Sequence, residues 1–193
     1  LAGYGAHVLR IDPLDWDEPA AVPEVGLGKR RARLDLRSLE GVATFERLLS
    51  QADVLVHGYR SDALEKLGLG EQRRRELNPG LVDVCLDAYG WTGDWRGRRG
   101  FDSLVQMSAG IADAGMRVQG KSVPTPLPVQ ALDHATGYLL AAAVLRGLGR
   151  RLDNGSGSST RASLARTAAV LMQRSLPQRR ESAGLPEGQP AVL

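Results

Sequence analysis

Short apolar runs alternate with helical patterns through the first half of the chain, and this alternation restricts the fold more than any other feature. Runs typical of strands lie at His7–Asp12, Asp53–His57 and Leu81–Ala88. Patterns typical of helices lie between them, at Ser38–Gln51, Ala63–Leu67 and Glu71–Leu77. Because such alternation is typical of parallel strands joined by helices, the sequence predicts an α/β fold with a doubly wound, mostly parallel sheet.

Two basic stretches each have two interpretations. Gly28–Arg37 alternates basic and apolar residues. This indicates either a strand whose basic side chains form a cationic lip for an anionic ligand, or a row of charged side chains that are only solvated. Tyr89–Gly100 is rich in glycine and arginine and also contains Trp91 and Trp95. Arginines on a flexible backbone either clamp a phosphate or simply form a solvated loop. The residues themselves leave both questions open.

A long apolar helix is the main feature of the second half. Phe101 starts a shorter helix that is expected to end near Ile111, and Gly115–Gly120 is expected to form a turn. The prolines of Pro124–Val129 extend the chain up to the long helix, Leu139–Arg151. A helix of this apolar character is expected to be buried or to pack against a partner chain.

Asp133 lies in the stretch that opens this helix, Gln130–Tyr138. Aspartate is a favoured N-cap, and the free N–H groups and positive end of a helix keep a carboxylate ionised. The alternative is that Asp133 is a carboxylate nucleophile, which accepts an acyl group. Because a nucleophile must be ionised, the two roles are compatible.

Both ends of the chain are expected to be truncated. Leu1–Ala6 has the pattern of a helix that ends at a glycine. We expect residues 1–151 to form a large α/β domain, residues 152–177 a helical continuation or linker, and residues 178–193 a disordered tail. Within the middle segment, Thr160–Ala165 is either a strand or the start of a helix, and Ala165–Leu176 is expected to be helical.

Several classes of site are excluded or disfavoured. Cys85 is the only cysteine, which excludes an internal disulfide and a multi-cysteine zinc site, and its apolar surroundings favour a core residue over a nucleophile. The three histidines lack metal-ligand spacing, so no metal site is predicted. The chain has no G-x-G-x-x-G or G-x-S-x-G motif, so dinucleotide binding and serine hydrolysis are not supported.

The charge balance favours an anionic small ligand. The net charge is +3 and the pI about 9.3, with arginine dominating the basic residues. No aromatic-rich basic surface is visible in the sequence, so nucleic acid is not the expected partner. No apolar run reaches the ~18 residues of a membrane span, and no basic-then-apolar leader is present. A cytoplasmic protein without membrane contact is therefore expected.

Several stretches taken in order resemble the class III CoA-transferases, the family of formyl-CoA transferase, carnitine CoA-transferase and α-methylacyl-CoA racemase. Each piece is weakly specific, but their order from Leu1 to about Arg151 is highly specific. The matching pieces are L-A-x-x-G-A-x-V-x-x-I-D at Leu1–Asp12, G-K-R-x-x-x-L-D-L-R-S-x-E-G at Gly28–Gly41, A-D-V-L-V-x-x-Y at Ala52–Tyr59, A-L-E-K-L-G-L at Ala63–Leu69, L-N-P-x-L-V at Leu77–Val82, G-x-T-G at Gly90–Gly93, G-F-D at Gly100–Asp102, and D-x-x-T-G or its alanine variant at Asp133–Gly137.

The resemblance implies a Rossmann-like large domain and a specific chemistry. In the family, the aspartate at the position of Asp133 attacks the thioester of an acyl-CoA donor and forms a mixed anhydride, and a carboxylic acid acceptor receives the CoA. Asp102 matches an acidic position near the active site of the family and is expected to be a supporting residue. His134, next to Asp133 in this sequence, is a second candidate for a supporting role. No tightly bound cofactor is implied, and the family forms interlocked homodimers. The implied CoA-binding residues are Leu34, Arg37, Gly58, Tyr59, Lys66 and Arg99.

Departures from the family pattern keep two alternatives open. Racemases of the family have a histidine where this chain has Phe101, so a two-base proton transfer would lack one base. His57–Asp62 replaces a Glu-Asn-Phe-x-Pro-Gly turn. His134 is a possible substitute base, although a polar contact at the helix start suits it better. Two alternatives to a transferase stay open. One is a 2-methylacyl-CoA racemase or epimerase. The other is an inactive CoA-binding fragment, because family members are longer than this chain.

Overall fold

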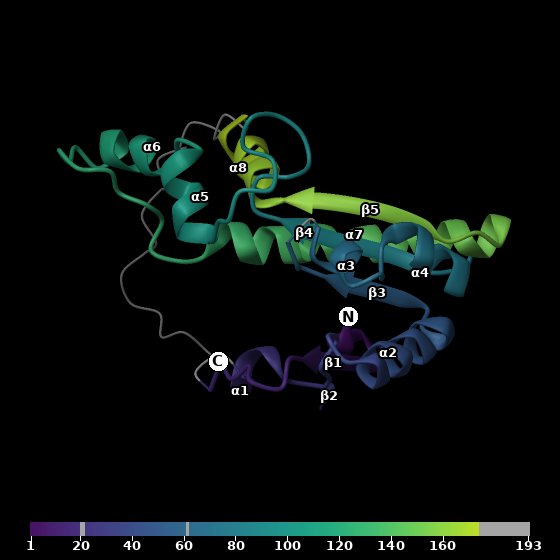
Figure 1. The fold of residues 1–193 in the computed structure, drawn as a ribbon. Helices are drawn as coiled ribbons and strands as arrows, with labels where there is room; N and C mark the ends of the chain where they lie inside the picture. Colours follow the sequence, from purple (N-terminus) through teal and green to yellow (C-terminus); the bar gives the residue numbers. More distant parts are fainter. Residues whose placement is uncertain (20–21, 61, 174–193) are drawn as a thin grey trace, which may run out of the picture.

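The computed structural model describes residues 1–19, 22–60 and 62–173 (Figure 1). Parallel pairing joins all neighbouring strands, in one sheet of order β1-β2 and a second of order β3-β4-β5. The predicted α/β class with parallel strands is therefore confirmed, with the detail that the strands form two sheets. The strands are β1 (Val8–Asp12), β2 (Lys29–Arg33), β3 (Val54–His57), β4 (Val82–Asp87) and β5 (Ser158–Ser163).

Helices connect the strands and extend beyond them. A short 3-10 helix at Ala2–Tyr4 ends at Gly5, whose φ of 90° is readily adopted only by glycine. The helices are α1 (Val22–Val25), α2 (Leu39–Gln51), α3 (Ala63–Lys66), α4 (Glu71–Leu77), α5 (Asp102–Ser108), α6 (Ile111–Val118), α7 (Ala131–Asn154) and α8 (Leu164–Gln173).

Helix α2 joins the two sheets into one core. The Ser38 hydroxyl accepts a hydrogen bond from the Gly41 N–H over 3.0 Å, which caps the helix. Buried Phe45 and Leu49 pack in a cluster that also holds Ile11 of β1 and Leu55 of β3. Since burying each such side chain contributes about 1.5–3 kcal/mol, α2 fixes both sheets against a common apolar surface.

Helix α7 lies along the sheet of β3, β4 and β5 (Figure 1). Leu140 and Val144 are buried against Val82 and Val84 of the central strand β4. A Cβ at Gly147 would lie 2.6 Å from a Val82 methyl, so glycine permits this close approach. The expected burial of the apolar helix holds for this face only, because Leu139 and Leu145 on other faces are 50% and 64% exposed.

The structure corrects several local predictions. Helix α7 begins at Ala131, earlier than expected, and its N-cap is Gln130 and not Asp133. Gly115 lies inside α6, where a turn was predicted, and the turn comes at Gly120.

The segment after residue 151 contains more than a helical continuation or linker. Helix α7 continues to Asn154, and the open choice at Thr160–Ala165 is settled as a strand, since β5 pairs with β4 from Ser158 to Ser163. Helix α8 then covers much of the predicted helix. The division into domains stays a prediction, and the predicted tail at 178–193 lies outside the described residues.

Candidate functional site

Asp133 is held at the start of α7 by a residue from another helix. It lies in the first turn, and its backbone N–H donates to Oδ2 of Asp102 over 2.8 Å. Asp102 opens α5 and is only 1% exposed, whereas Asp133 is exposed. The structure therefore brings together two carboxyl groups that the sequence had singled out, one buried as a support and one accessible.

Gln106 completes this arrangement, and the sequence gave no reason to choose it. Its side chain is 2% exposed, and its Nε2 donates to Oδ1 of Asp102 and, over 3.0 Å, to the carbonyl of Val129. Its Oε1 accepts from the N–H of Leu127 over 2.8 Å. Gln106 lies one turn after Asp102 on α5, so spacing of four residues was the only available signal.

The electrostatic surroundings of Asp133 differ from the expectation. Desolvation by surrounding protein atoms raises the pKa of its carboxyl, the negative charge of Asp102 raises it further, and His134 lowers it. The helix start was expected to favour the ionised form, but burial and the charge of Asp102 favour the neutral form. His134 is exposed, and its backbone N–H bonds to the Gln130 carbonyl over 3.2 Å. Its role as a supporting residue stays a prediction.

A pocket of about 290 Å³ contains some of the predicted CoA-binding residues. Leu34, Arg37 and Tyr59 line it, together with acidic and apolar residues that follow β1. The pKa of the Tyr59 hydroxyl is raised by burial and then by the charge of Asp12. Burial opposes ionisation of Asp12, but hydrogen bonds from two arginines of β1 and β2 hold its pKa below the ordinary value. The pocket thus joins residues of β1, the segment after β2 and the turn after β3.

The other predicted CoA-binding residues do not line this pocket. Gly58 precedes Tyr59, and a side chain there would meet only Leu86, at 4.0 Å. Lys66 ends α3 and pairs with Asp62 at 2.5 Å, one turn earlier. Arg99 is exposed in the loop before α5. Their grouping around one ligand therefore stays a prediction.

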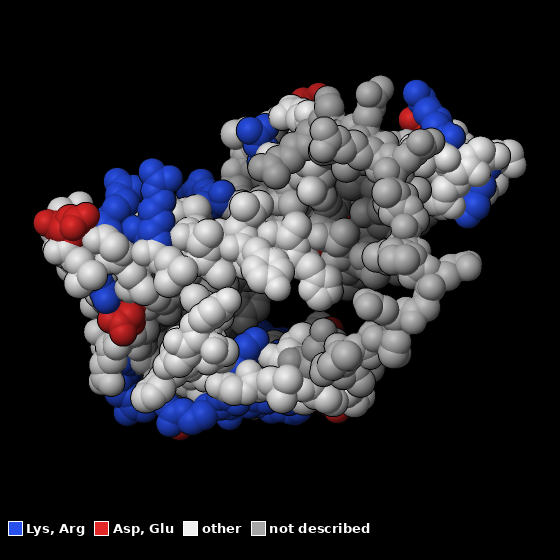
Figure 2. Space-filling model, turned by 180° about the vertical axis from the view of Figure 1, so that it is seen from behind, with Lys and Arg blue, Asp and Glu red and all other residues white. Residues whose placement is uncertain are grey.

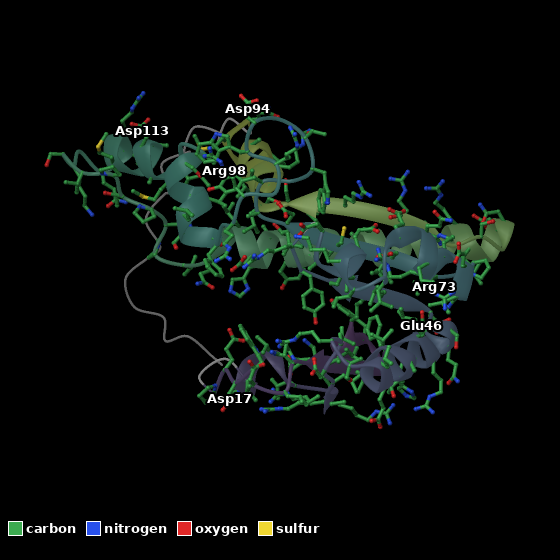
Figure 3. The ribbon with its side chains drawn as sticks, in the orientation of Figure 1. Asp17, Glu46, Arg73, Asp94, Arg98 and Asp113 are labelled. Carbon is green, nitrogen blue, oxygen red and sulfur yellow. The ribbon has the colours of Figure 1, made fainter. Side chains whose placement is uncertain are left out.

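The arginine-rich loop and β2 present basic side chains at the surface. Arg98, labelled in Figure 3, lies 4.5 Å above the ring of Trp95, and Trp95 contacts Tyr89 edge-on. Figure 2 shows basic side chains along the lower edge of the molecule, where β1 and β2 lie. The predicted strand at Gly28–Arg37 is confirmed for Lys29–Arg33, and its basic residues are exposed. The strand is therefore confirmed, and whether its basic residues contact a ligand or are only solvated stays open.

A buried ion pair beside β3 was not predicted. Arg74 of α4 donates from Nε to Oδ2 of Asp83 over 2.8 Å, and both side chains are under 10% exposed. Burial opposes the charge of Asp83, but His57 and Arg74 lower its pKa. The Nε2 of His57 lies 3.4 Å from Oδ1 of Asp83. Cys85 is buried, as expected of a core residue, and burial raises its pKa to about 11.

Two features of the described residues bear on other classes of function. Within residues 1–19, 22–60 and 62–173, no group of three or more His, Cys, Asp or Glu side chains could hold a metal ion. None of the helices in this part of the chain is long and apolar enough to cross a membrane.

Comparison with known proteins gives consistent matches. The model of CoA-transferase family III matches residues 1–191. A probable fatty acyl-CoA transferase of Mycobacterium tuberculosis, Rv3272, is 38% identical over 66% of this chain and 32% of its own length. A crystal structure of Rv3272 superimposes with a TM-score of 0.76 and 31% identity, over 89% of this chain and 52% of that one. Human α-methylacyl-CoA racemase is 30% identical over 89% of this chain and 44% of its own length. The chain thus spans about half, or less, of the length of these relatives.

Proposed function

The chain belongs to CoA-transferase family III, and we propose that it transfers CoA from an acyl-CoA donor to a carboxylic acid through an anhydride on Asp133. A carboxylate oxygen of Asp133 attacks the thioester carbonyl, the C–S bond breaks, and the CoA thiolate leaves with the electron pair. The thiolate then attacks the carbonyl carbon of Asp133, and the donor acid leaves. The acceptor carboxylate displaces the thiolate again, which finally attacks the acceptor carbonyl and restores Asp133.

The hydrogen bond from the Asp133 N–H to Asp102 is the observation that carries the proposal. It fixes the backbone of Asp133 in the first turn of α7, and the carboxylate oxygens of Asp133 accept no hydrogen bond from the described residues. An accessible carboxylate on a fixed backbone suits nucleophilic attack, because its position is set before the substrate arrives. The buried carboxylate of Asp102 has both oxygens occupied and is suited to support rather than attack.

CoA binding is proposed around the 290 Å³ pocket. Leu34 and Arg37 line the pocket and are assigned to the adenine side of CoA on the family resemblance, and Tyr59 adds an aromatic surface to the same pocket. We extend the site to Gly58, Lys66 and Arg99 on the family resemblance, with the basic groups contacting phosphates. No tightly bound cofactor enters this scheme. The proposal places the protein in the cytoplasm as a homodimer.

Racemisation is the less favoured activity. A human racemase is among the relatives, yet the residue before Asp102 is Phe101, which is 79% exposed and carries no ionisable group. A two-base exchange at the α-carbon therefore lacks a base at that place. If it occurred nevertheless, deuterium from the solvent would enter the α-position of a 2-methylacyl-CoA.

Trapping of the acyl group tests the proposal. The intact protein and the segment 1–193 are incubated with acyl-CoA, treated with hydroxylamine, and analysed by mass spectrometry for a hydroxamate on the peptide that contains Asp133. We expect the adduct in the wild type and in Asp113→Asn, an exposed control on α6, and its loss in Asp133→Asn. A wild type that binds CoA in calorimetry but never forms the adduct would support the inactive CoA-binding fragment instead.

A further inference from the structure

The amide of Gln106 is the point where α5 meets the segment that leads into α7. It is buried, and each of its hydrogen-bonding atoms is used: Nε2 by Asp102 and Val129, and Oε1 by Leu127. Leu127 and Val129 flank Pro128 immediately before the helix. A single side chain therefore ties the entry segment of α7 to the carboxylate that holds Asp133.

These contacts restrain Asp133 from two directions. The entry segment has no regular secondary structure, so its own backbone does not define where α7 starts. Gln106 binds that segment directly, and it also orients Asp102 through Oδ1 so that Oδ2 faces the N–H of Asp133. An amide suits this position because it donates and accepts at once, which a carboxylate or an apolar side chain cannot do.

We infer that Gln106 is a positioning residue for Asp133, which sets the place of the nucleophile by joining Asp102 to the Leu127–Val129 segment. This inference rests on the proposed function, because it concerns the rate at which Asp133 accepts the acyl group. Gln106 touches neither the substrate nor the reacting atoms in this scheme. Its loss is therefore expected to slow acylation and to leave CoA affinity unchanged.

The test compares variants of similar size in the intact protein. Gln106→Met keeps the length of the side chain and removes its hydrogen bonds, and Gln72→Met makes the same change at an exposed position of α4. The rate of adduct formation on Asp133 and the Kd for CoA are measured for each. We expect Gln106→Met to reduce the rate at least tenfold with an unchanged Kd, and Gln72→Met to match the wild type.

A second pair of variants covers the case in which Gln106→Met fails to fold. Leu127→Pro removes the N–H from which Gln106 accepts and leaves the Gln106 side chain itself in place. Val123→Pro is the control, because Val123 also precedes a proline and its N–H has no hydrogen bond among the described residues. We expect slower acylation in Leu127→Pro alone. A wild type that forms the adduct while Gln106→Met or Leu127→Pro acylates at the wild-type rate overturns the inference. A wild type without adduct instead overturns the proposed function.

Discussion

The carboxylate of Asp102 caps a helix to which it does not belong. Its Oδ2 accepts the N–H of Asp133 over 2.8 Å, while the N-cap residue Gln130 provides no side-chain hydrogen bond. One of the free N–H groups at the start of α7 is thus satisfied by a residue 31 positions earlier in the chain. The same contact brings a negative charge near the carboxyl of Asp133, so the support of the backbone and the pKa of the side chain are linked.

Substitution of Asp102 separates these two effects. In Asp102→Asn the side-chain carbonyl can still accept the Asp133 N–H, although the amide NH2 replaces the oxygen that accepts from Gln106. The charge is gone, so the pKa of Asp133 falls toward its ordinary value. The acidic limb of the acylation rate should move to lower pH. In Asp102→Ala the cap is also lost, at a cost of about 1–2 kcal/mol in the free energy of unfolding. Urea unfolding and a pH–rate profile measure both, and an acidic limb that stays in place in Asp102→Asn would contradict the linkage.

Asp133→Asn is expected to stabilise the fold at neutral pH. The folded pKa of Asp133 is raised above its unfolded value, so the folded state retains this proton to a higher pH than the unfolded state does. Stability from this group is therefore full below the unfolded pKa and declines as pH rises through the folded pKa. The variant avoids that decline. Thermal unfolding should give a higher Tm for Asp133→Asn than for the wild type at pH 7, and the difference should shrink below pH 3.8, the ordinary pKa of the group.

Asp113→Asn provides the control for this effect. Asp113 is also in the first turn of a helix, and its carboxylate pairs with Arg117 at 2.9 Å on the surface. Because exposed pairs contribute about 0–1 kcal/mol, this variant should lose a little stability or none. A gain in both variants would point to a general effect of removing acidic charge and not to the surroundings of Asp133.

The pocket predicts a selective loss of CoA affinity in Arg37→Ala. Arg37 lines the pocket, whereas Arg30 is exposed on β2 and does not line it. Loss of one contact from a charged group, worth about 1.5–3 kcal/mol, should raise the Kd for CoA roughly tenfold or more. Calorimetry on Arg37→Ala and Arg30→Ala measures this directly. Equal losses in the two variants would indicate attraction by overall charge rather than a site in the pocket.

Local pattern predicted most of the elements, with α6 as an exception, but it did not predict the contacts between them. The limits of α4 at Glu71 and Leu77 were predicted correctly, because an apolar pattern and the following Asn-Pro-Gly stop act within a few residues. The sequence indicated Asp133 as the N-cap, before the helix. In the structure Asp133 lies in the first turn, and its N–H is capped by Asp102 of α5, which a local pattern cannot reveal. Gln106 was missed for the same reason. Hydrogen bonds between residues 23 or 31 positions apart depend on the path of the chain, which periodicity does not encode.

Two neighbouring arginines, Arg74 and Arg73, show how burial determines the stability lost when an ion pair is broken. Arg74→Met leaves Asp83 buried without its partner, so we expect a loss of about 3–5 kcal/mol in the free energy of unfolding. Arg73→Met breaks the pair with Glu46, which is 2.7 Å long and joins α4 to α2 at the surface (Figure 3), and should cost about 0–1 kcal/mol. Urea unfolding compares the two.

The difference between these two variants follows from where the charges lie. The side chains of Arg74 and Asp83 are 8% and 3% exposed, whereas those of Arg73 and Glu46 are 45% and 24% exposed. Water can solvate Glu46 after Arg73 is replaced, but it has little access to Asp83, with only the His57 ring 3.4 Å away as a second partner. Equal losses of stability in Arg74→Met and Arg73→Met would contradict this dependence on burial.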